Sequence, residues 1–358
     1  MSNAIFNLPK AYNEPVFPYL PGDKARTALK AELARQSELV VDIPVIIGGK
    51  EYFTDNKGKC VMPHDFNHTL ANYSIAGETE MKLAADTACA AQKEWADMPF
   101  EHRASIFLKA ADLLTGPWRA KINAATMLGQ SKTAFQAEID SACELADFFR
   151  YNVEYAQQIY SQQPENGKGI WNRLEYRPLD GFIVAISPFN FTSIGGNLCT
   201  APAIMGNTVI WKPSQAATLS NYYVMKLLEE AGLPKGVINF VPCRGSDVSK
   251  YLLTDPRMAG FHFTGSTSVF SGVWKLVGEN IAKYKSYPRL VGETGGKDFI
   301  FAHPTADVEP LVAAMVRGAY EFQGQKCSAA SRAFIPASLW DRVKTRALEE
   351  IAKLKIGD

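Results

Sequence analysis

From Gly181 onward, short apolar strands alternate with helical stretches, and this alternation limits the folds open to the chain. The predicted strands are GFIVAI, TVIWKP, VINFVP, the first part of AGFHFTGS (which ends as a loop), DFIF and RAFIPASLW. The first predicted helices cover LCTAPAIMG and Ala217 to Ala231. A third begins at Ser246, and a fourth follows AGFHFTGS and ends at about Gly278. The last two cover Val308 to Phe322 and RVKTRALEEIAKLKIG. Alternation at this interval forms βαβ units, so we predict an α/β fold with a doubly wound parallel sheet.

The earlier part of the chain has a different pattern. Between Glu78 and Tyr160, Ala, Leu, Phe and Trp recur at helical spacing, with breaks near Pro99 and Pro117. Before this region, IPVIIGGKEYF predicts a short hairpin that turns at its paired glycines. After it, PENGKG predicts a loop, and IWNRLEYRP alternates side-chain type as a strand does. We therefore expect a mostly helical region ahead of the alternating sheet.

Composition argues against several classes of function. The 358 residues are 47% hydrophobic with a formal net charge of +1, so they can bury a large core but offer no charge excess for nucleic acid or an anionic membrane. The apolar stretches are too short for a transmembrane helix. The N-terminus lacks a charged-then-apolar leader pattern, and acids occur early, at Glu14 and Asp23. We expect a cytoplasmic protein, with the mitochondrial matrix as the alternative.

The cysteines and histidines give no metal or disulfide pattern. No two of the six cysteines form a Cys-x-x-Cys pair, which favours a reducing compartment. Five are expected to be small buried side chains, namely Cys60, Cys89, Cys143, Cys199 and Cys243. His64 and His68 lie four residues apart, but their Pro-, Asn- and Asp-rich surroundings favour a solvated loop over metal ligands. We predict no metal site.

Two features could contact a nucleotide. FTGSTS places a small-residue loop between a strand and a helix N-terminus, where free backbone N–H groups attract a diphosphate. The same kind of strand-to-helix turn is also common in proteins where it binds no ligand. Lys212 ends the strand TVIWK, and ligands of open α/β sheets bind at the C-terminal ends of strands, although a solvated lysine is the alternative. The Rossmann, P-loop and serine-hydrolase glycine motifs are all absent.

A cysteine and a glutamate are candidates for chemistry. Cys327, in GQKCSAASR, follows the predicted helix end at Gly324, which puts its thiol on a loop beside Lys326. An ordinary cysteine is only a few per cent thiolate at neutral pH, and positive charge raises that fraction. Glu293, in VGETGGK, is predicted at a strand end among glycines, which allow a ligand to approach closely. A carboxylate beside a thiol suits a general base that activates water against a covalent intermediate.

The motifs PFN, WKPS, FTGS, ETGGK and GQKC occur in the order and approximate spacing of the aldehyde dehydrogenase superfamily. The chain resembles that superfamily over nearly its whole length. Within it, the likeness is greatest to the pyrroline-5-carboxylate (L-glutamate γ-semialdehyde) dehydrogenase branch, which acts in proline breakdown to glutamate. Three features indicate this branch: Ser328 after the cysteine in GQKCSAASR, the helical series QAEIDSACELADFFRYN, and Phe270, where many members have glycine.

The resemblance implies an aldehyde dehydrogenase-like fold of doubly wound parallel sheets. Residues 1–168 and 181–293 would form an N-terminal helical region and a Rossmann-type NAD-binding domain. Residues 169–180 would form one strand of an oligomerisation flap, and residues 294–358 the first part of a catalytic domain. The same resemblance implies NAD as cofactor, a small-molecule aldehyde as substrate, and a homo-oligomer.

The resemblance also implies a catalytic trio. Cys327 would attack the aldehyde to give a thiohemiacetal, whose oxyanion would accept hydrogen bonds from the Asn190 side chain and the Cys327 backbone N–H. One such donor typically contributes about 3–4 kcal/mol to transition-state stabilisation. After hydride transfer leaves a thioester, Glu293 would activate the water that releases the acid.

Further contacts follow from the same likeness. For the cofactor they are the Ser187 backbone, the Lys212 side chain at the adenosine ribose, and the diphosphate loop made of Gly265, Ser266, Thr267, Ser268 and Val269. For the substrate they are Ser328 at its carboxylate, Phe191 in the wall of the aldehyde pocket, and Glu144. A salt bridge would explain Glu144 equally well.

Two departures from the family pattern bear on these expectations. Gln215 stands where NAD-preferring members often carry an acid, so use of NADP stays open beside NAD. Members also extend well beyond residue 358, and the further part would supply a ribose-binding glutamate, a substrate loop and the second flap strand. We therefore expect the 358-residue chain alone to be poorly active or insoluble. An aldehyde dehydrogenase with another substrate and a catalytically silent protein of this fold are the alternatives.

Overall fold

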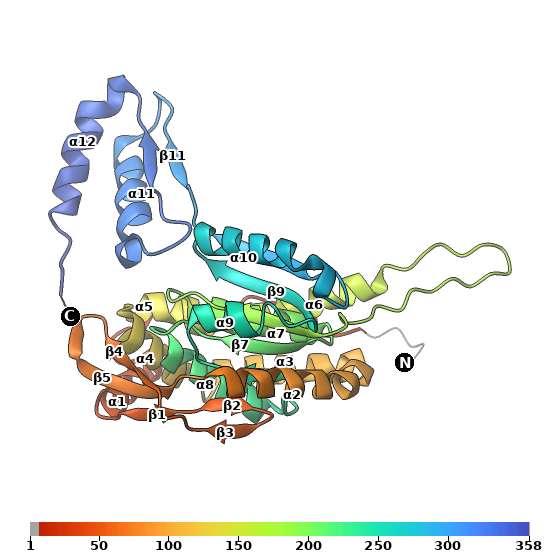
Figure 1. Cartoon of the computed structure of the whole chain (residues 1–358). Coiled ribbons are helices and arrows are strands. Elements are labelled where there is room, and N and C mark those ends of the chain that lie inside the picture. Colours follow the sequence, from red (N-terminus) through yellow and green to blue (C-terminus); the bar gives the residue numbers. More distant parts are fainter. Residues whose placement is uncertain (1–6, 358) are drawn as a thin grey trace. The chain divides into compact units, whose positions relative to one another are not determined.

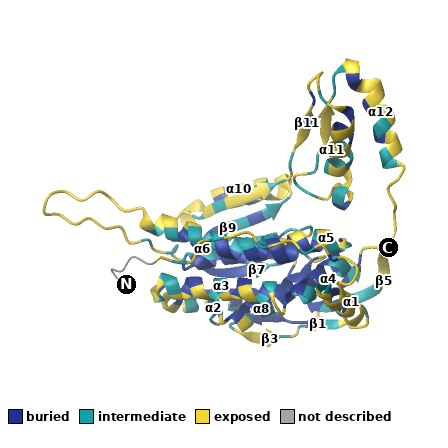
Figure 2. Cartoon of the chain, turned by 180° about the vertical axis from the view of Figure 1, so that it is seen from behind, coloured by how far each residue is buried: buried dark blue, intermediate teal, exposed yellow. Residues whose placement is uncertain are grey.

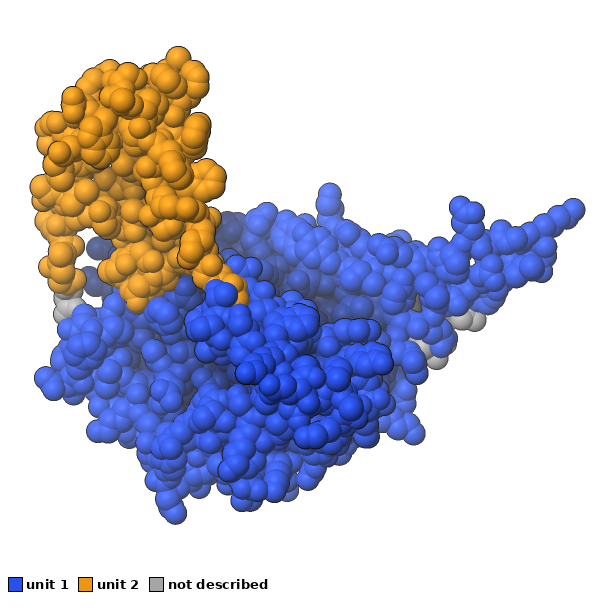
Figure 3. Space-filling view, turned by 45° about the horizontal axis from the view of Figure 1, so that its top comes forward, with its two compact units in different colours: residues 1–293 blue, residues 294–358 orange. Residues whose placement is uncertain are grey.

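The computed structural model describes residues 7–357, which form two compact units divided between Glu293 and Thr294 (Figure 3). The helices of the first unit are α1 (Lys24–Ser37), α2 (Glu78–Asp97), α3 (Phe100–Thr115), α4 (Arg119–Gln130), α5 (Ala134–Ala137), the π-helix η1 (Glu138–Glu144), α6 (Leu145–Ser161), α7 (Thr192–Ile204), α8 (Thr218–Ala231), α9 (Gly245–Tyr251), α10 (Thr267–Glu279) and the 3₁₀-helix η2 (Ile281–Lys283). Its strands are β1 (Val41–Ile43), β2 (Val45–Ile47), β3 (Lys50–Tyr52), β4 (Lys57–Met62), β5 (Asp65–Ser74), β6 (Phe182–Ile186), β7 (Thr208–Lys212), β8 (Ile238–Phe240), β9 (Met258–Gly265) and β10 (Arg289–Thr294).

A seven-stranded sheet forms the centre of the first unit, in the order β10-β9-β6-β7-β8-β2-β3. The neighbours β9, β6, β7 and β8 run parallel to one another, which confirms the predicted doubly wound sheet. The predicted hairpin is β2 and β3, and β2 also pairs antiparallel with β8. Its turn places Gly48 and Gly49 at φ values of 60° and 70°, a left-handed conformation that favours glycine at both positions.

Helices cover both faces of this sheet because its strands are apolar on both sides (Figures 1 and 2). Ile183 and Ala185 of β6 belong to the core packed under α3, α6, α7 and α8. Phe182 and Val184, the alternate residues of the same strand, belong to the core under α2, α9 and α10. The two-residue period of a strand therefore divides one apolar run between two cores.

The strand order reverses at β6. The chain passes from β6 to β7 and β8 on one side and then crosses to β9 on the other. Ile186 is in register with both Lys212 and Phe263, so the C-terminal ends of these three strands align. In open α/β sheets ligands bind outside the C-terminal strand ends where the order reverses, so this edge is the expected binding site.

The first region contains more sheet than the sequence pattern predicted. β1 pairs parallel, and β4 antiparallel, with β5 in a separate three-stranded sheet. The loop predicted around His64 and His68 is confirmed at His64 and wrong at His68. His64 lies in the turn between β4 and β5 with Nδ1 2.7 Å from Ser131 Oγ, and His68 lies on β5 with Nε2 2.6 Å from the Ser37 carbonyl oxygen. The polar residues of this stretch belong to a tight turn and to the exposed start of β5. Within residues 7–357 no three His, Cys, Asp or Glu side chains form a group that could hold a metal ion.

The segment between α6 and β6 is a long extended loop, drawn in yellow-green in Figure 1. The strand predicted at IWNRLEYRP is therefore wrong. Instead of a backbone ladder, the Gln163 amide donates to the Leu174 carbonyl (3.3 Å) and accepts from the Leu174 N–H (2.8 Å). Ile170 and Trp171 are 61% and 67% exposed. A strand needs a neighbouring strand to pair its backbone groups, and the described chain supplies none here.

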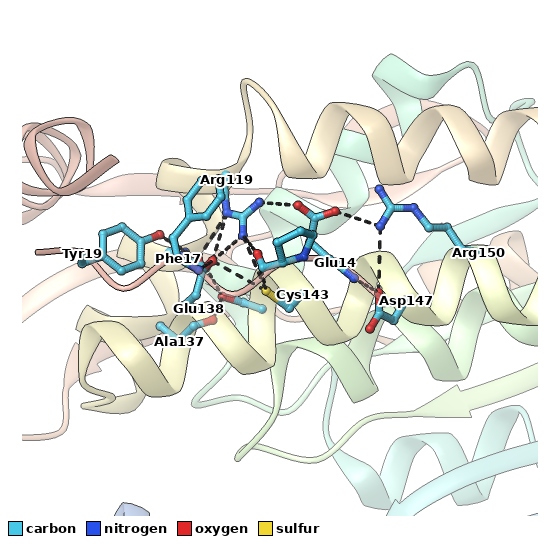
Figure 4. Close-up of polar contacts among 12 residues, drawn as sticks. Glu14, Phe17, Tyr19, Arg119, Ala137, Glu138, Cys143, Asp147 and Arg150 are labelled. Carbon is cyan, nitrogen blue, oxygen red and sulfur yellow. Dashed lines mark hydrogen bonds and ion pairs between the residues drawn. The ribbon is translucent and has the colours of Figure 1, made fainter. Parts of the chain in front are cut away.

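A buried charge network fixes the N-terminal segment to the helices (Figure 4). The Glu138 carboxylate accepts hydrogen bonds from the Phe17 backbone N–H (2.8 Å) and the Tyr19 hydroxyl (2.7 Å), and it pairs with Arg119. Arg119 also pairs with Glu14 at 2.6 Å. Burial acts to raise the pKa of Glu138, but the hydrogen bonds from Arg119, Phe17 and Tyr19 outweigh it and hold that pKa below its ordinary value.

All six cysteines are free, and four of the five that were predicted to be buried are so, namely Cys60, Cys143, Cys199 and Cys243. Cys89 is half-buried. Burial, with the neighbouring Glu138, raises the pKa of Cys143 to about 12. These thiols are therefore neutral packing groups at physiological pH. Among the described residues no helix is both long and apolar enough to cross a membrane.

The second unit is a two-stranded parallel sheet with two main helices. Its elements are β11 (Phe299–Phe301), α11 (Val308–Tyr320), the 3₁₀-helix η3 (Glu321–Gly324), β12 (Arg332–Phe334) and α12 (Ala337–Ile351). α11 and α12 share a small core that includes Leu311 and Val343. RAFIPASLW was predicted to be entirely strand, but Pro336 stands at the N-cap of α12, so ASLW begins that helix.

Candidate active site

The loop after β6 leads from the sheet edge to α7. Ser187 at its start is buried. The Ser187 hydroxyl accepts a hydrogen bond from Trp211 Nε1 (3.1 Å), and its N–H donates to the Lys212 carbonyl (3.2 Å). These bonds hold Ser187 at the C-terminal strand ends, where its backbone was expected to meet the cofactor.

Three expected site residues meet at the N-terminus of α7. The Asn190 carbonyl accepts a hydrogen bond from Lys132 Nζ (2.6 Å), and the same ammonium lies 4.3 Å from the centroid of the Phe191 ring. Glu144, at the end of η1, accepts a hydrogen bond from the Ser193 hydroxyl (2.7 Å). The three residues expected in the site, Asn190, Phe191 and Glu144, thus lie close together in the first unit. Lys132 was missed, because nothing in its sequence context distinguishes it from a solvated lysine.

The expected diphosphate loop forms the end of β9 and the first turn of α10. Ser266 is the N-cap of α10, and its hydroxyl accepts a hydrogen bond from the Val269 N–H (3.4 Å). The residues from Ser266 to Val269 are exposed, and the first turn carries no acid that would neutralise the positive helix end. A Cβ on Gly265 would come within 2.5 Å of the Phe263 ring, so any other residue there would have to displace that ring. This turn fits an anionic group.

Lys212 ends β7 at the same edge of the sheet and is half-buried. Burial lowers the pKa of its ammonium. Among residues 7–357 the Lys212 ammonium has no hydrogen bond or ion pair, so its donors are available to a ligand. Ser187, Lys212 and the turn after β9 all lie at the C-terminal ends of neighbouring strands. Together they could hold a dinucleotide there.

Glu293 is exposed near the C-terminal end of β10. The residue before it, Gly292, faces the ring of Phe270, which would overlap any Cβ there. Phe270 in turn stacks on Phe263, with ring centroids 5.7 Å apart and planes inclined by 4°. The Phe270 ring thus occupies the space that a side chain at position 292, next to the candidate base, would need.

Cys327 lies in a turn of the second unit, between η3 and β12, as the loop prediction requires, and it is half-buried. The Ala330 N–H donates to the Gly318 carbonyl (2.9 Å), and the Ser331 N–H donates to the Asp298 carbonyl (3.0 Å). A Cβ on Gly296 would overlap the carbonyl oxygen of Cys327. The Gly-Gly-Lys stretch that follows Glu293 therefore packs directly on the backbone of the candidate nucleophile.

The surroundings of this turn differ from expectation in one respect. Lys326 was expected to supply positive charge to the thiol, but its ammonium lies 3.4 Å from a carboxylate oxygen of Glu321, which offsets that charge. Just before the turn, Phe322 and Gln323 adopt left-handed backbone conformations with φ of 51° and 52°. Such conformations cost about 1–3 kcal/mol each and are concentrated at functional sites. Ser328 occupies the same turn as the cysteine.

A pair of neighbouring glycines tests the role of this contact. Gly296→Ala is expected to displace the Cys327 backbone and to lower the rate of any reaction at its thiol by more than about 100-fold, since a shift of about 1 Å in a reacting group has that effect. Gly295→Ala is the matched control, because a Cβ there meets no atom within 4 Å. Turnover and thiol alkylation rates would be measured for both. Equal activities of the two variants would contradict the assigned contact.

The aldehyde dehydrogenase family profile matches residues 53–358. Together with the parallel sheet and the arrangement of its strand-end loops, this match defines the class: the chain belongs to the aldehyde dehydrogenase family.

The relatives narrow the comparison to one branch. The chain is 51% identical over 357 residues to delta-1-pyrroline-5-carboxylate dehydrogenase of Agaricus bisporus, covering 99% of this chain and 65% of the relative. It is 49% identical over 354 residues to the mitochondrial delta-1-pyrroline-5-carboxylate dehydrogenase of Dictyostelium discoideum, covering 98% and 63%. The crystal structure of the Mycobacterium tuberculosis enzyme bound with NAD matches with a TM-score of 0.97 and 54% identity, covering 100% of this chain and 67% of that one. The chain thus spans slightly less than two thirds of the length of these curated relatives.

Proposed function

We propose that the polypeptide carrying this sequence oxidises L-glutamate γ-semialdehyde to L-glutamate with NAD, through a thioester on Cys327. The relatives at 49–51% identity are named for pyrroline-5-carboxylate, and the M. tuberculosis structure holds NAD. In this assignment residues 181–293 belong to the NAD-binding domain and residues 294–358 to the catalytic domain.

The observation that carries the proposal is the packing of Gly296 on Cys327. Three peptide units separate Glu293 from Gly296, so covalent geometry keeps their Cα atoms within about 11 Å of each other. The candidate base is therefore tied by a short tether to the backbone of the candidate nucleophile. No packing requirement explains why that tether should carry a carboxylate at one end and meet a cysteine at the other.

The residues divide the chemistry as follows. The Cys327 thiolate attacks the aldehyde carbon, and the oxyanion accepts hydrogen bonds from the Asn190 amide and the Cys327 N–H. The former aldehyde carbon loses its hydride as the thioester forms, and NAD, when bound, would supply the acceptor for that hydride. Glu293 then removes a proton from the water that attacks the thioester carbon, and the C–S bond breaks to release the acid and the thiolate.

The chain's own residues support NAD as the cofactor. The unneutralised N-terminus of α10 would receive the diphosphate, and Lys212 would donate to the adenosine ribose. The turn from Gly265 through Thr267 and Ser268 to Val269 would line the diphosphate. Gln215 places no carboxylate beside that ribose, so NADP is the cofactor to compare with NAD in every assay.

Substrate contacts, location and assembly complete the proposal. Ser328 would bind the substrate carboxylate, while Phe191 and Glu144 would line the aldehyde pocket. The name of the D. discoideum relative includes the word mitochondrial, which supports a mitochondrial location over the cytoplasm expected here. The exposed loop between α6 and β6 would take part in a homo-oligomer.

The test is NADH formation by the polypeptide at its natural length. L-glutamate γ-semialdehyde is expected to give a kcat/KM at least about 100-fold above that of propanal, since a site with charged contacts discriminates strongly against a substrate that lacks their partners. Equal rates with both aldehydes would overturn the substrate assignment. No NADH with either aldehyde would overturn the proposed chemistry.

A further inference from the structure

An ion pair lies beneath the loop that carries Asn190. Lys132, between α4 and α5, and Asp140, in η1, approach to 2.6 Å, and their side chains are only 1% and 2% exposed. Neither residue has a role in the chemistry set out above. Burying two charges costs several kcal/mol per ion unless other hydrogen bonds satisfy them, so the remaining contacts of this pair decide its purpose.

Asp140 caps α7 from a distant part of the chain. Its Oδ2 accepts a hydrogen bond from the Thr192 N–H (3.1 Å), and its Oδ1 accepts one from the Ser193 N–H (3.0 Å). These are the first two N–H groups of α7, which have no partner within the helix. The N-cap residue, Phe191, makes no side-chain cap of its own. One carboxylate therefore fixes the first turn of the helix in place of a local cap.

Lys132 acts on the two residues just before that turn. Its ammonium donates to the Asn190 carbonyl (2.6 Å) and faces the Phe191 ring at 4.3 Å. Every residue from 190 to 193 is thus held by Lys132 or Asp140. The π-helical form of η1 accompanies this arrangement, and π-helical turns are frequent at functional sites.

We propose that Lys132 and Asp140 are positioning residues, whose ion pair fixes the backbone from Asn190 to Ser193 and so aims the Asn190 amide at the oxyanion. The inference rests on the proposed function for its catalytic consequence. We call the contacts of Lys132 and Asp140 with residues 190–193 the clamp. The clamp lies within the first unit, and its effect on the backbone can be measured without any reaction. A hydrogen-bond donor stabilises an oxyanion only when it is held in the right direction before the charge develops.

The first measurement is amide hydrogen exchange in the polypeptide at its natural length. Lys132→Met keeps the length of the side chain but removes its charge, and Asp140→Asn keeps an acceptor but breaks the ion pair. Both are expected to speed exchange at Thr192 and Ser193 by at least about tenfold, because local opening becomes easier. Lys226→Met is the matched control, since Lys226 pairs with Glu229 (2.6 Å) at a partly exposed site on α8. Unchanged exchange in the Asp140 variant would overturn the clamp, whether or not the Lys132 variant folds.

The second measurement asks whether the clamp serves Asn190. Single-turnover NADH formation is expected to fall about 10- to 100-fold in Lys132→Met or Asp140→Asn, with NAD affinity unchanged. Asn190→Ala is expected to lower the single-turnover rate about 10²–10³-fold in the native background. In the Asp140→Asn background it should lower that rate at most a few-fold. Equal costs in both backgrounds would reduce the pair to a purely structural role and overturn the inference. If the native polypeptide forms no NADH, the proposed function fails, while the exchange experiment still decides the clamp.

Discussion

Replacing Cys327 with alanine is expected to abolish NADH formation from L-glutamate γ-semialdehyde, with a loss on the order of 10⁴-fold or more. The proposed route depends on a covalent bond to this sulfur, and loss of a nucleophile leaves only the contributions of binding and the oxyanion donors. NAD affinity should be unchanged, because the residues assigned to the cofactor lie in the first unit. Initial rates and NAD titration would be measured on the same preparation.

Cys89→Ala provides the matched control. Cys89 is free and half-buried like Cys327, and its replacement removes the same sulfur. It lies on α2, a helix that carries none of the residues assigned to the chemistry. Its activity is expected to stay within about twofold of the native protein, as surface-like substitutions usually have small effects. Comparable losses in the two variants, or residual turnover in Cys327→Ala, would contradict the assignment of the nucleophile.

Arg119→Ala is expected to lower the free energy of unfolding by about 3–5 kcal/mol. The substitution leaves the Glu138 carboxylate, which is 0% exposed, without its cation, and an unpaired buried charge is strongly destabilising. Arg35→Ala is the control, because Arg35 pairs with Glu32 at 2.5 Å with its side chain 47% exposed. Such a surface pair contributes about 0–1 kcal/mol. Urea unfolding of both variants gives the comparison, and similar midpoints would show that the network adds no stability.

The same network predicts a pH dependence. The folded state holds the pKa of Glu138 below its ordinary value, so its carboxylate stabilises the fold at any pH above about 4.3, the value in an unfolded chain. That contribution is lost as the pH falls from there through the lower folded pKa. Native stability should therefore drop in this acid range, whereas Arg119→Ala should show a weaker slope. Equal slopes from pH 5 to pH 3 would rule out the assigned coupling.

Sequence pattern predicted the parallel sheet because each of its central strands is a continuous apolar run bounded by turn residues. β6 and β7 are buried on both faces, so their composition alone distinguishes them from the flanking helices. Local chemistry also predicted the hairpin at the paired glycines Gly48 and Gly49 and the end of α8 at Ala231, just before Gly232, which adopts the left-handed conformation with φ of 99°. Such features depend on a few adjacent residues.

Features that depend on distant partners could not be predicted in this way. The segment at IWNRLEYRP has strand-like alternation, but a strand forms only where another backbone pairs with it. The turn at His64 resembles a loop in composition, and only the pairing of β4 with β5 reveals the hairpin. The role of Lys132 depends on a carboxylate eight residues away and a carbonyl 58 residues away. The residues next to Lys132 in the sequence do not indicate either of these partners.

The N-terminal segment cannot be treated as a dispensable leader when expression plasmids are designed. A product that starts at Met62, the next methionine after the first, would lack Glu14, Phe17 and Tyr19 and would strip Glu138 of two of its hydrogen-bond donors. Truncations into this segment should lower the stability of the first unit, because they remove the partners of Glu138 and Arg119.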